Sequence, residues 1–162
     1  MKSFFQASGF RRILPRVVLA GSARLGLAWT PEASAPPELP LPDRFFAGGD
    51  NSIRGFALDA VGPLEVSTTG ALVPTGGNAL LIGSAELRID AGHRFSVALF
   101  SDSGNVYPLV SDMTLYDIRY VAGLGLRYKS ALGPVRVDWG YKLNRRPNES
   151  AGHIHVTIGH AF

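Results

Sequence analysis

Apolar and polar residues alternate one by one in six segments of this chain, at residues 17–29, 81–90, 96–104, 118–128, 135–143 and 154–162. A period of two is typical of a β-strand with one apolar face. In the segment 118–128, for example, Leu124 and Leu126 lie on one face, and Gly123 and Gly125 lie on the other. The pattern therefore predicts an all-β protein with about six strands.

The polar face of these strands carries glycine beside charge. Gly125 is followed on that face by Arg127, and Asp138 is followed by Gly140. Small and charged residues together suit the crowded, wet interior of a barrel whose apolar side faces lipid. Aromatic residues on the apolar face are typical of the girdles at membrane interfaces; they are Tyr120, Tyr128, Trp139 and Tyr141. We therefore predict an antiparallel transmembrane β-barrel in a lipid bilayer.

Short and long connections alternate between the predicted strands. The short ones lie at 90–94 and 129–134, and the long ones lie at 30–79, 107–116 and 144–152. This alternation is typical of outer-membrane barrels, which have short periplasmic turns and longer outer loops. About six strands cannot close a barrel, because the known minimum is about eight and open edges in lipid are costly. We therefore expect the chain to be the C-terminal part of a longer protein, such as the product of a truncated reading frame.

Composition narrows the classes of protein further. The 162 residues suit one domain, and 18% are charged, against roughly 25% in soluble domains. The net charge of +3 is scattered, which argues against a nucleic-acid partner. The absence of cysteine excludes a disulfide framework and a thiolate metal site. No apolar run approaches the roughly 18 to 20 residues of a membrane helix.

The first 29 residues have some features of a signal peptide, because Lys2, Arg11 and Arg12 precede an apolar patch. Pro15 stands at the start of that patch and Arg24 interrupts it, however, and the patch alternates. We therefore expect residues 1–15 to be a short N-terminal segment and residues 16–162 to form the barrel part, with a signal peptide as the less favoured alternative.

The long loop 30–79 is built to place one arginine. It opens with five prolines between Pro31 and Pro42, which neither a strand ladder nor a helix tolerates. Gly48 and Gly49 then precede an Arg54-Gly55 pair, so the backbone bends sharply on both sides of a guanidinium. A guanidinium folded into protein needs carboxylates. The predicted polar faces offer two, Glu86 and Asp102.

Other chemistry finds less support. The paired glycines of the loop lack the Gly-Lys-Ser/Thr and the helix of a phosphate-binding loop. His153 and His155 share a strand face, but no third ligand is evident, so no metal is expected. We find no nucleophile with its base and therefore predict no enzyme activity and no cofactor. Glu86, Asp102 and Asp138 are expected to pair with nearby arginines, which are Arg88, Arg127 and Arg136.

Six motifs occur in a recognisable order. They are R-F-F-A-G-G-D-N-S-I-R-G-F at 44–56, G-G-N-A-L-L-I-G-S-A-E-L at 76–87, F-S-D-S-G at 100–104, G-L-G-L-R-Y at 123–128, L-G-P-V-R-V-D at 132–138 and a terminal strand that ends in Phe162. Together they resemble the barrel of the BamA and TamA superfamily of outer-membrane assembly factors, also called bacterial surface antigens. The resemblance covers residues 16–162, as the last six strands of a sixteen-stranded barrel, and the first motif is more similar to the TamA-like branch.

The resemblance implies a loop that folds into the lumen and pins its Arg-Gly tip to the barrel wall. Carried over by motif, this structural lock consists of Arg54, Gly55, Phe56, Glu86, Asp102 and Gly104. The terminal strand, with Gly159 and Phe162, resembles the C-terminal signal by which such barrels are recognised for insertion. In the family that strand also pairs weakly with strand one, at a lateral seam where client strands are thought to be templated.

The resemblance also implies a function and a location. We expect a barrel in the outer membrane of a Gram-negative bacterium that takes part in the assembly, insertion or translocation of outer-membrane proteins, with these clients and the assembly machinery as partners. Related barrels serve protein insertion, protein secretion and lipid export, and the sequence leaves these open. Family members carry POTRA domains and ten further strands that are absent here. The alternative is a passive or oligomerising barrel fragment, or a secreted β-sheet protein, without transport activity.

Overall fold

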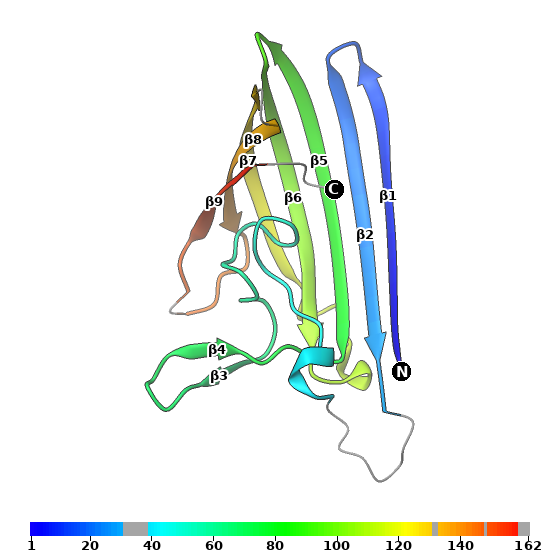
Figure 1. The fold of residues 1–162 in the computed structure, drawn as a ribbon, viewed down its shortest axis with the longest axis vertical. Helices are drawn as coiled ribbons and strands as arrows, with labels where there is room; N and C mark the ends of the chain where they lie inside the picture. The colour runs from blue at the N-terminus through cyan, green and yellow to red at the C-terminus, as the bar shows by residue number, and fades with distance from the viewer. Residues whose placement is uncertain (31–38, 131–132, 148, 159–162) are drawn as a thin grey trace.

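The computed structural model describes residues 1–30, 39–130, 133–147 and 149–158. Within them, seven strands form one curved sheet in which every neighbouring pair is antiparallel. In spatial order the strands are β1 (Lys2–Leu14), β2 (Val17–Ala28), β5 (Ala79–Gly92), β6 (Phe95–Tyr107), β7 (Arg119–Ser130), β8 (Gly133–Lys142) and β9 (Gly152–Ile158). Figure 1 shows that the sheet curves without closing.

The sheet has one strand more than the six segments identified in the sequence, because residues 2–14, expected to belong to a short N-terminal segment, form a strand, β1. This strand pairs with β2 almost along its whole length, from Lys2 opposite Ala28 to Leu14 opposite Val17. The alternation was hidden by doubled residues such as Phe4 and Phe5, which place an aromatic on each face. β1 and β2 thus form a hairpin over the stretch that has some features of a signal peptide.

The two faces of the sheet have opposite chemistry, as the alternation predicts. Directly paired residues share a face, so one row on the outer face runs across six strands; it consists of Leu19, Leu87, Leu99, Leu124, Trp139 and Ile154. The inner face carries buried acidic and basic residues, which include Glu86, Asp102, Arg136 and Asp138. An apolar outer surface over a charged interior is the arrangement of a transmembrane barrel wall.

The connections between strands differ at the two ends of the sheet. The turns from β1 to β2 and from β5 to β6 take two residues each, and they lie at the top of Figure 1. At the opposite end, residues 108–118 join β6 to β7 and include a 3-10 turn, η2 (Val110–Asp112). The two ends therefore correspond to the short turns and long loops expected from the sequence.

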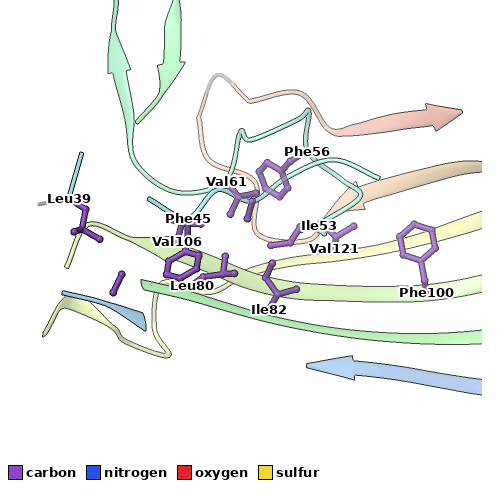
Figure 2. Packing of buried hydrophobic residues seen from close by; sticks show 12 residues of the cluster. Leu39, Phe45, Ile53, Phe56, Val61, Leu80, Ile82, Phe100, Val106 and Val121 are labelled. Atoms are coloured by element: carbon purple, nitrogen blue, oxygen red, sulfur yellow. The ribbon is translucent and has the colours of Figure 1, made fainter. Parts of the chain in front are cut away.

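The longest connection, between β2 and β5, folds back into the curve of the sheet (Figure 1). Its described part contains a 3-10 turn, η1 (Leu41–Asp43), and a small hairpin of β3 (Leu64–Val66) and β4 (Leu72–Pro74). Four of its apolar side chains pack on the inner face of the sheet (Figure 2), and these are Phe45, Ile53, Phe56 and Val61. The buried apolar core of the described chain is therefore shared between loop and sheet.

No helix among the described residues is long and apolar enough to cross a membrane.

Candidate functional site on the inner face of the sheet

The loop segment from Leu39 to Val61, here called the inner loop, is held in place by backbone bonds at its base. Phe45 forms a bridge with Gly77, and Ala47 forms a bridge with Val61. Gly48 has φ 115°, and a Cβ there would lie 2.4 Å from the backbone oxygen of Ala57. Gly48 therefore allows two segments of the loop backbone to approach closely, at a place where the sequence predicts a sharp bend.

Arg54 lies at the tip of the inner loop and binds two carboxylates of the sheet. Its Nε donates to Asp102 Oδ2 and its Nη2 donates to Asp102 Oδ1, both at 2.8 Å, so the contact is bidentate. Its Nη1 donates to Glu86 Oε2 at 2.6 Å. The guanidinium carbon also lies 3.5 Å from the ring centroid of Phe100. Carboxylates of strands β5 and β6 therefore form direct ion pairs with the arginine at the loop tip.

These three groups are almost completely shielded from solvent. Arg54 is 4% exposed, Glu86 is 1% exposed and Asp102 is fully buried. The backbone N–H of Arg54 also donates to Asp102 Oδ2 at 3.1 Å. Asp102 therefore fixes both the side chain and the backbone of the loop tip, which makes it the main anchor on the wall.

The ion cluster continues sideways along the inner face. Glu86 also accepts from Arg88 Nε at 2.8 Å and from Arg127 Nη2 at 3.2 Å. Arg127 donates to Asp138, which lies 3.7 Å from Arg54. Three guanidiniums thus face three carboxylates, so the cluster formed by Arg54, Arg88, Arg127, Glu86, Asp102 and Asp138 is balanced in charge.

Arg136 on the inner face binds a partner that strand alternation does not predict. The sequence predicts that Arg136 pairs with one of Glu86, Asp102 and Asp138, but its ion pair is with Asp50 of the inner loop, at 3.5 Å. Strand alternation gives the face of a residue but not its lateral neighbours, so this loop contact could not be predicted.

Glycines on the sheet bring the tip close to the wall. Gly140 of β8 lies under the tip, and a Cβ there would be 2.7 Å from backbone atoms of Arg54 and Gly55. A Cβ on Gly55 would be 2.6 Å from Val121. Sequence reasoning identified Gly55 but missed Gly140, although Gly140 stands on the predicted polar face. A glycine opposite an inserted loop is the signal that could have found it.

Phe56 follows the Arg-Gly pair and is enclosed by two cations. Arg119 lies with its guanidinium carbon 4.9 Å from the ring centroid of Phe56, and Lys142 Nζ lies 4.3 Å from the same centroid. The ring is buried, and its backbone oxygen lies 3.0 Å from His155 Nε2 on β9. Phe56 therefore connects the tip to β7, β8 and β9.

The remaining candidates are placed as follows. Gly104 lies on β6 beside the tip, and a Cβ there would be 2.3 Å from the backbone oxygen of Leu81. His153 and His155 stack with ring centroids 4.6 Å apart. Among the described residues, no three His, Cys, Asp or Glu side chains are grouped to hold a metal ion. Gly159 and Phe162 lie outside the described residues, so their role as an insertion signal stays a prediction.

An apolar outer face, a charged inner wall and a loop inserted from the long-loop end define a section of a transmembrane β-barrel. Residues 1–162 match the family model of the Omp85 superfamily domain. The chain therefore belongs to the Omp85 superfamily, which agrees with the BamA and TamA resemblance.

Individual relatives support this assignment. The chain is 25% identical over 158 residues to outer membrane protein assembly factor BamA of Neisseria meningitidis, covering 77% of this chain and 19% of that protein. It is 30% identical over 147 residues to BamA of Neorickettsia risticii, covering 85% of this chain and 19% of that protein. It is also 28% identical over 127 residues to the chloroplastic outer envelope protein 80 of Arabidopsis thaliana, covering 72% of this chain and 15% of that protein.

A solved structure confirms the fold. The chain superimposes with a TM-score of 0.78 on BamA from Haemophilus ducreyi lacking POTRA domains 1-3, at 22% identity, covering 97% of this chain and 34% of that one. The chain thus spans about a fifth of the length of the BamA relatives it matches. The predicted all-β transmembrane fold and its location in the outer membrane of a Gram-negative bacterium are confirmed.

Proposed function

We propose that the chain forms the C-terminal barrel wall of an outer-membrane factor that assembles or inserts outer-membrane proteins. The proposal is supported by membership of the Omp85 superfamily and by relatives named as assembly factors. Because the chain spans about a fifth of those relatives, the activity belongs to the whole barrel. Its clients are other outer-membrane proteins, and this wall contributes no catalytic step.

The contribution of this chain is a lock that fixes the inner loop against the wall. The observation that carries it is the bidentate contact of Arg54 with Asp102, together with the bond from Arg54 to Glu86. Asp102 is fully buried, so withdrawal of the loop would take away the arginine that it binds, which is costly. Glu86 would keep its bonds from Arg88 and Arg127. Gly55 and Phe56 bring the backbone and an aromatic ring into the same contact, and Gly104 leaves room for the neighbouring strand. The lock therefore holds the loop in one position.

The test compares Arg54→Ala with the unchanged protein in the barrel that carries this chain. We expect the variant to expose residues 39–61 to limited proteolysis and to reduce the yield of outer-membrane proteins inserted into vesicles. Arg54→Lys keeps the charge but cannot form the bidentate contact. It should therefore show an intermediate loss, which separates loss of geometry from loss of charge.

The matched control is Arg146→Ala, which removes an equal charge from an exposed ion pair with Asp117 at the long-loop end. It should leave both proteolysis and insertion unchanged. If Arg54→Ala opens the loop but client insertion continues at the normal rate, the lock has no part in assembly. If no barrel with this wall inserts clients at all, the passive or oligomerising barrel is the better description.

A further inference from the structure

A small cavity lies between the inner loop and the inner face of the sheet. Its free volume, measured as the space in which the centre of a water-sized sphere can lie, is about 10 Å³. That is room for one small particle. Three arginines and one carboxylate are the charged residues that line it in the described part of the chain, and these are Arg24, Arg54, Arg136 and Asp50. The cavity is therefore strongly basic for its size.

Arg136 lines this cavity and lacks hydrogen-bond acceptors. It is 2% exposed, so its guanidinium is almost completely removed from water. Its Nη2 donates to Asp50 Oδ2 at 3.5 Å, to the backbone oxygen of Asp50 at 3.4 Å and to Thr157 Oγ1 at 3.3 Å, which are all long contacts. Its Nε and Nη1 have no partner among the described residues. Buried polar groups without partners are costly, so an acceptor beside Arg136 would be stabilising.

Arg24 reaches the same cavity from β2. Its Nη1 donates to the backbone oxygen of Asn51 at 2.7 Å, and its buried Nε finds no partner in the part of the chain that the structure describes. Because the sheet curves around the loop (Figure 1), Arg24 on β2 and Arg136 on β8 both contact residues 50–52. Ser84 of β5 adds a hydroxyl, which can also donate to an acceptor. Donors from three strands thus line one cavity.

The charges around the cavity do not balance. The neighbouring ion cluster contains three guanidiniums and three carboxylates. Arg24 and Arg136 add two positive charges beside it, and Asp50 adds one negative charge. Asp138 lies two residues from Arg136 on β8, but it is already counted in the cluster, where it binds Arg127. The cavity and the cluster together therefore have an excess of one positive charge among the described residues.

We propose that this cavity binds one monovalent anion of about the size of chloride. The anion lies beside Arg136 and Arg24, accepts hydrogen bonds from their guanidiniums and cancels the excess charge. A water molecule is the competing occupant. Water fits by size, but it brings no charge and must donate as well as accept, in a wall where guanidinium donors predominate.

The bound anion adds a contact to the hold on the inner loop. It connects β2 and β8 through the two arginines that already contact residues 50–52. This contact lies beside the ion pairs of Arg54 and is separate from them. The inference goes beyond the proposed function and does not depend on client assembly.

The experiment follows chloride binding through the width of the chloride NMR signal, which increases when the ion exchanges with a protein site. The barrel that carries this chain is held in a non-ionic detergent, and sodium chloride replaces sodium gluconate at constant ionic strength. We expect excess broadening that follows one saturable site. Arg136→Gln should weaken chloride binding about tenfold or more, because it removes a buried charged donor. Asp50→Asn should tighten binding, because it removes the one carboxylate that lines the described part of the cavity.

The matched control is Arg146→Gln, which removes an equal charge from the exposed ion pair with Asp117 and should leave chloride binding unchanged. If Arg136→Gln fails to fold, Asp50→Asn still tests the site, since a loss of affinity there contradicts the proposal. Absence of saturable broadening in the unchanged protein would overturn it and leave water as the occupant. Equal losses in Arg136→Gln and Arg146→Gln would also overturn it. Client insertion is not measured, so failure here leaves the proposed function untouched.

Discussion

Ion pairs on the inner wall and ion pairs at the long-loop end use the same chemical groups in different surroundings. Arg54 and Asp102 are shielded from water, whereas Arg146 and Asp117 are 52% and 53% exposed in their side chains. Removing one partner of a buried pair leaves the other charge buried without compensation, which is strongly destabilising. Removing one partner of an exposed pair leaves the other charge in water, which costs little. The comparison teaches that burial, and not the number of ion pairs, decides which contacts hold this structure together.

The largest effect is expected for Asp102→Ala. It removes the main anchor of the loop tip and leaves Arg54 buried, with Glu86 at 2.6 Å and Asp138 at 3.7 Å. We expect a loss of about 3 to 5 kcal/mol in the free energy of unfolding, measured by urea denaturation of the barrel in detergent. Adding Arg54→Ala should cost much less than it does alone, because the pair acts as a unit. Additive losses would contradict the lock.

The next effect is expected for Gly140→Ala, which places a methyl group 2.7 Å from the loop backbone. The tip must move away, so we expect a loss of about 1 to 3 kcal/mol in the free energy of unfolding and faster proteolysis of residues 39–61. Gly21→Ala is the control, because a Cβ there would lie 3.8 Å from its nearest neighbour. A loop that remains protected in Gly140→Ala would show that the tip is not pressed against β8.

A smaller effect on the free energy of unfolding is expected for Glu149→Gln. Glu149 is more exposed than Asp102 and less exposed than Asp117. Burial opposes ionisation of this carboxyl, but hydrogen bonds from Arg119 and from the backbone N–H of Arg146 outweigh it and lower its pKa below the ordinary value of 4.5. A lowered folded pKa stabilises the protein above the ordinary value, and this stability is lost as the pH falls through the folded value. Glu149→Gln should cost about 1 kcal/mol at neutral pH, and its difference from the unchanged protein should vanish in acid. A pH-independent difference would contradict this prediction.

The smallest effect is expected for Arg146→Gln. Its ion pair with Asp117 is exposed, so the free energy of unfolding should change by about 0 to 1 kcal/mol. At high salt the difference in the free energy of unfolding between the variant and the unchanged protein should disappear, because exposed charges are screened. A loss as large as that of Asp102→Ala would show that burial does not govern these pairs.

Alternation predicted the faces of the sheet because a strand shows its burial in every second residue. It placed Glu86 and Asp102 on the inner face, where the structure has them bound to Arg54. It missed β1, whose doubled Phe4-Phe5 and Arg11-Arg12 conceal the period. When both faces of a strand carry aromatic or cationic residues, the two faces do not differ in hydrophobicity, and alternation cannot identify the strand.

Lateral partners could not be predicted by the same route. The contacts of Phe56 with Arg119 and Lys142, and of Arg136 with Asp50, join residues far apart along the chain. They depend on how deep the loop descends and on the curvature of the sheet. Neither the depth of the loop nor the curvature of the sheet produces a periodic pattern in the sequence. A glycine such as Gly140, in contrast, can indicate a place where two backbone segments lie close together.

The position of Arg54 makes the inner loop a check on strand register. Its guanidinium lies near carboxylates from three different strands, Glu86 on β5, Asp102 on β6 and Asp138 on β8. A slip of one residue in any strand would turn its carboxylate to the lipid side. The loop tip can therefore settle only after the intervening strands have paired correctly, which makes its closure a late, long-range step in folding. The ion pairs of Arg54 can thus form only when strands β5 to β8 are paired in the correct register.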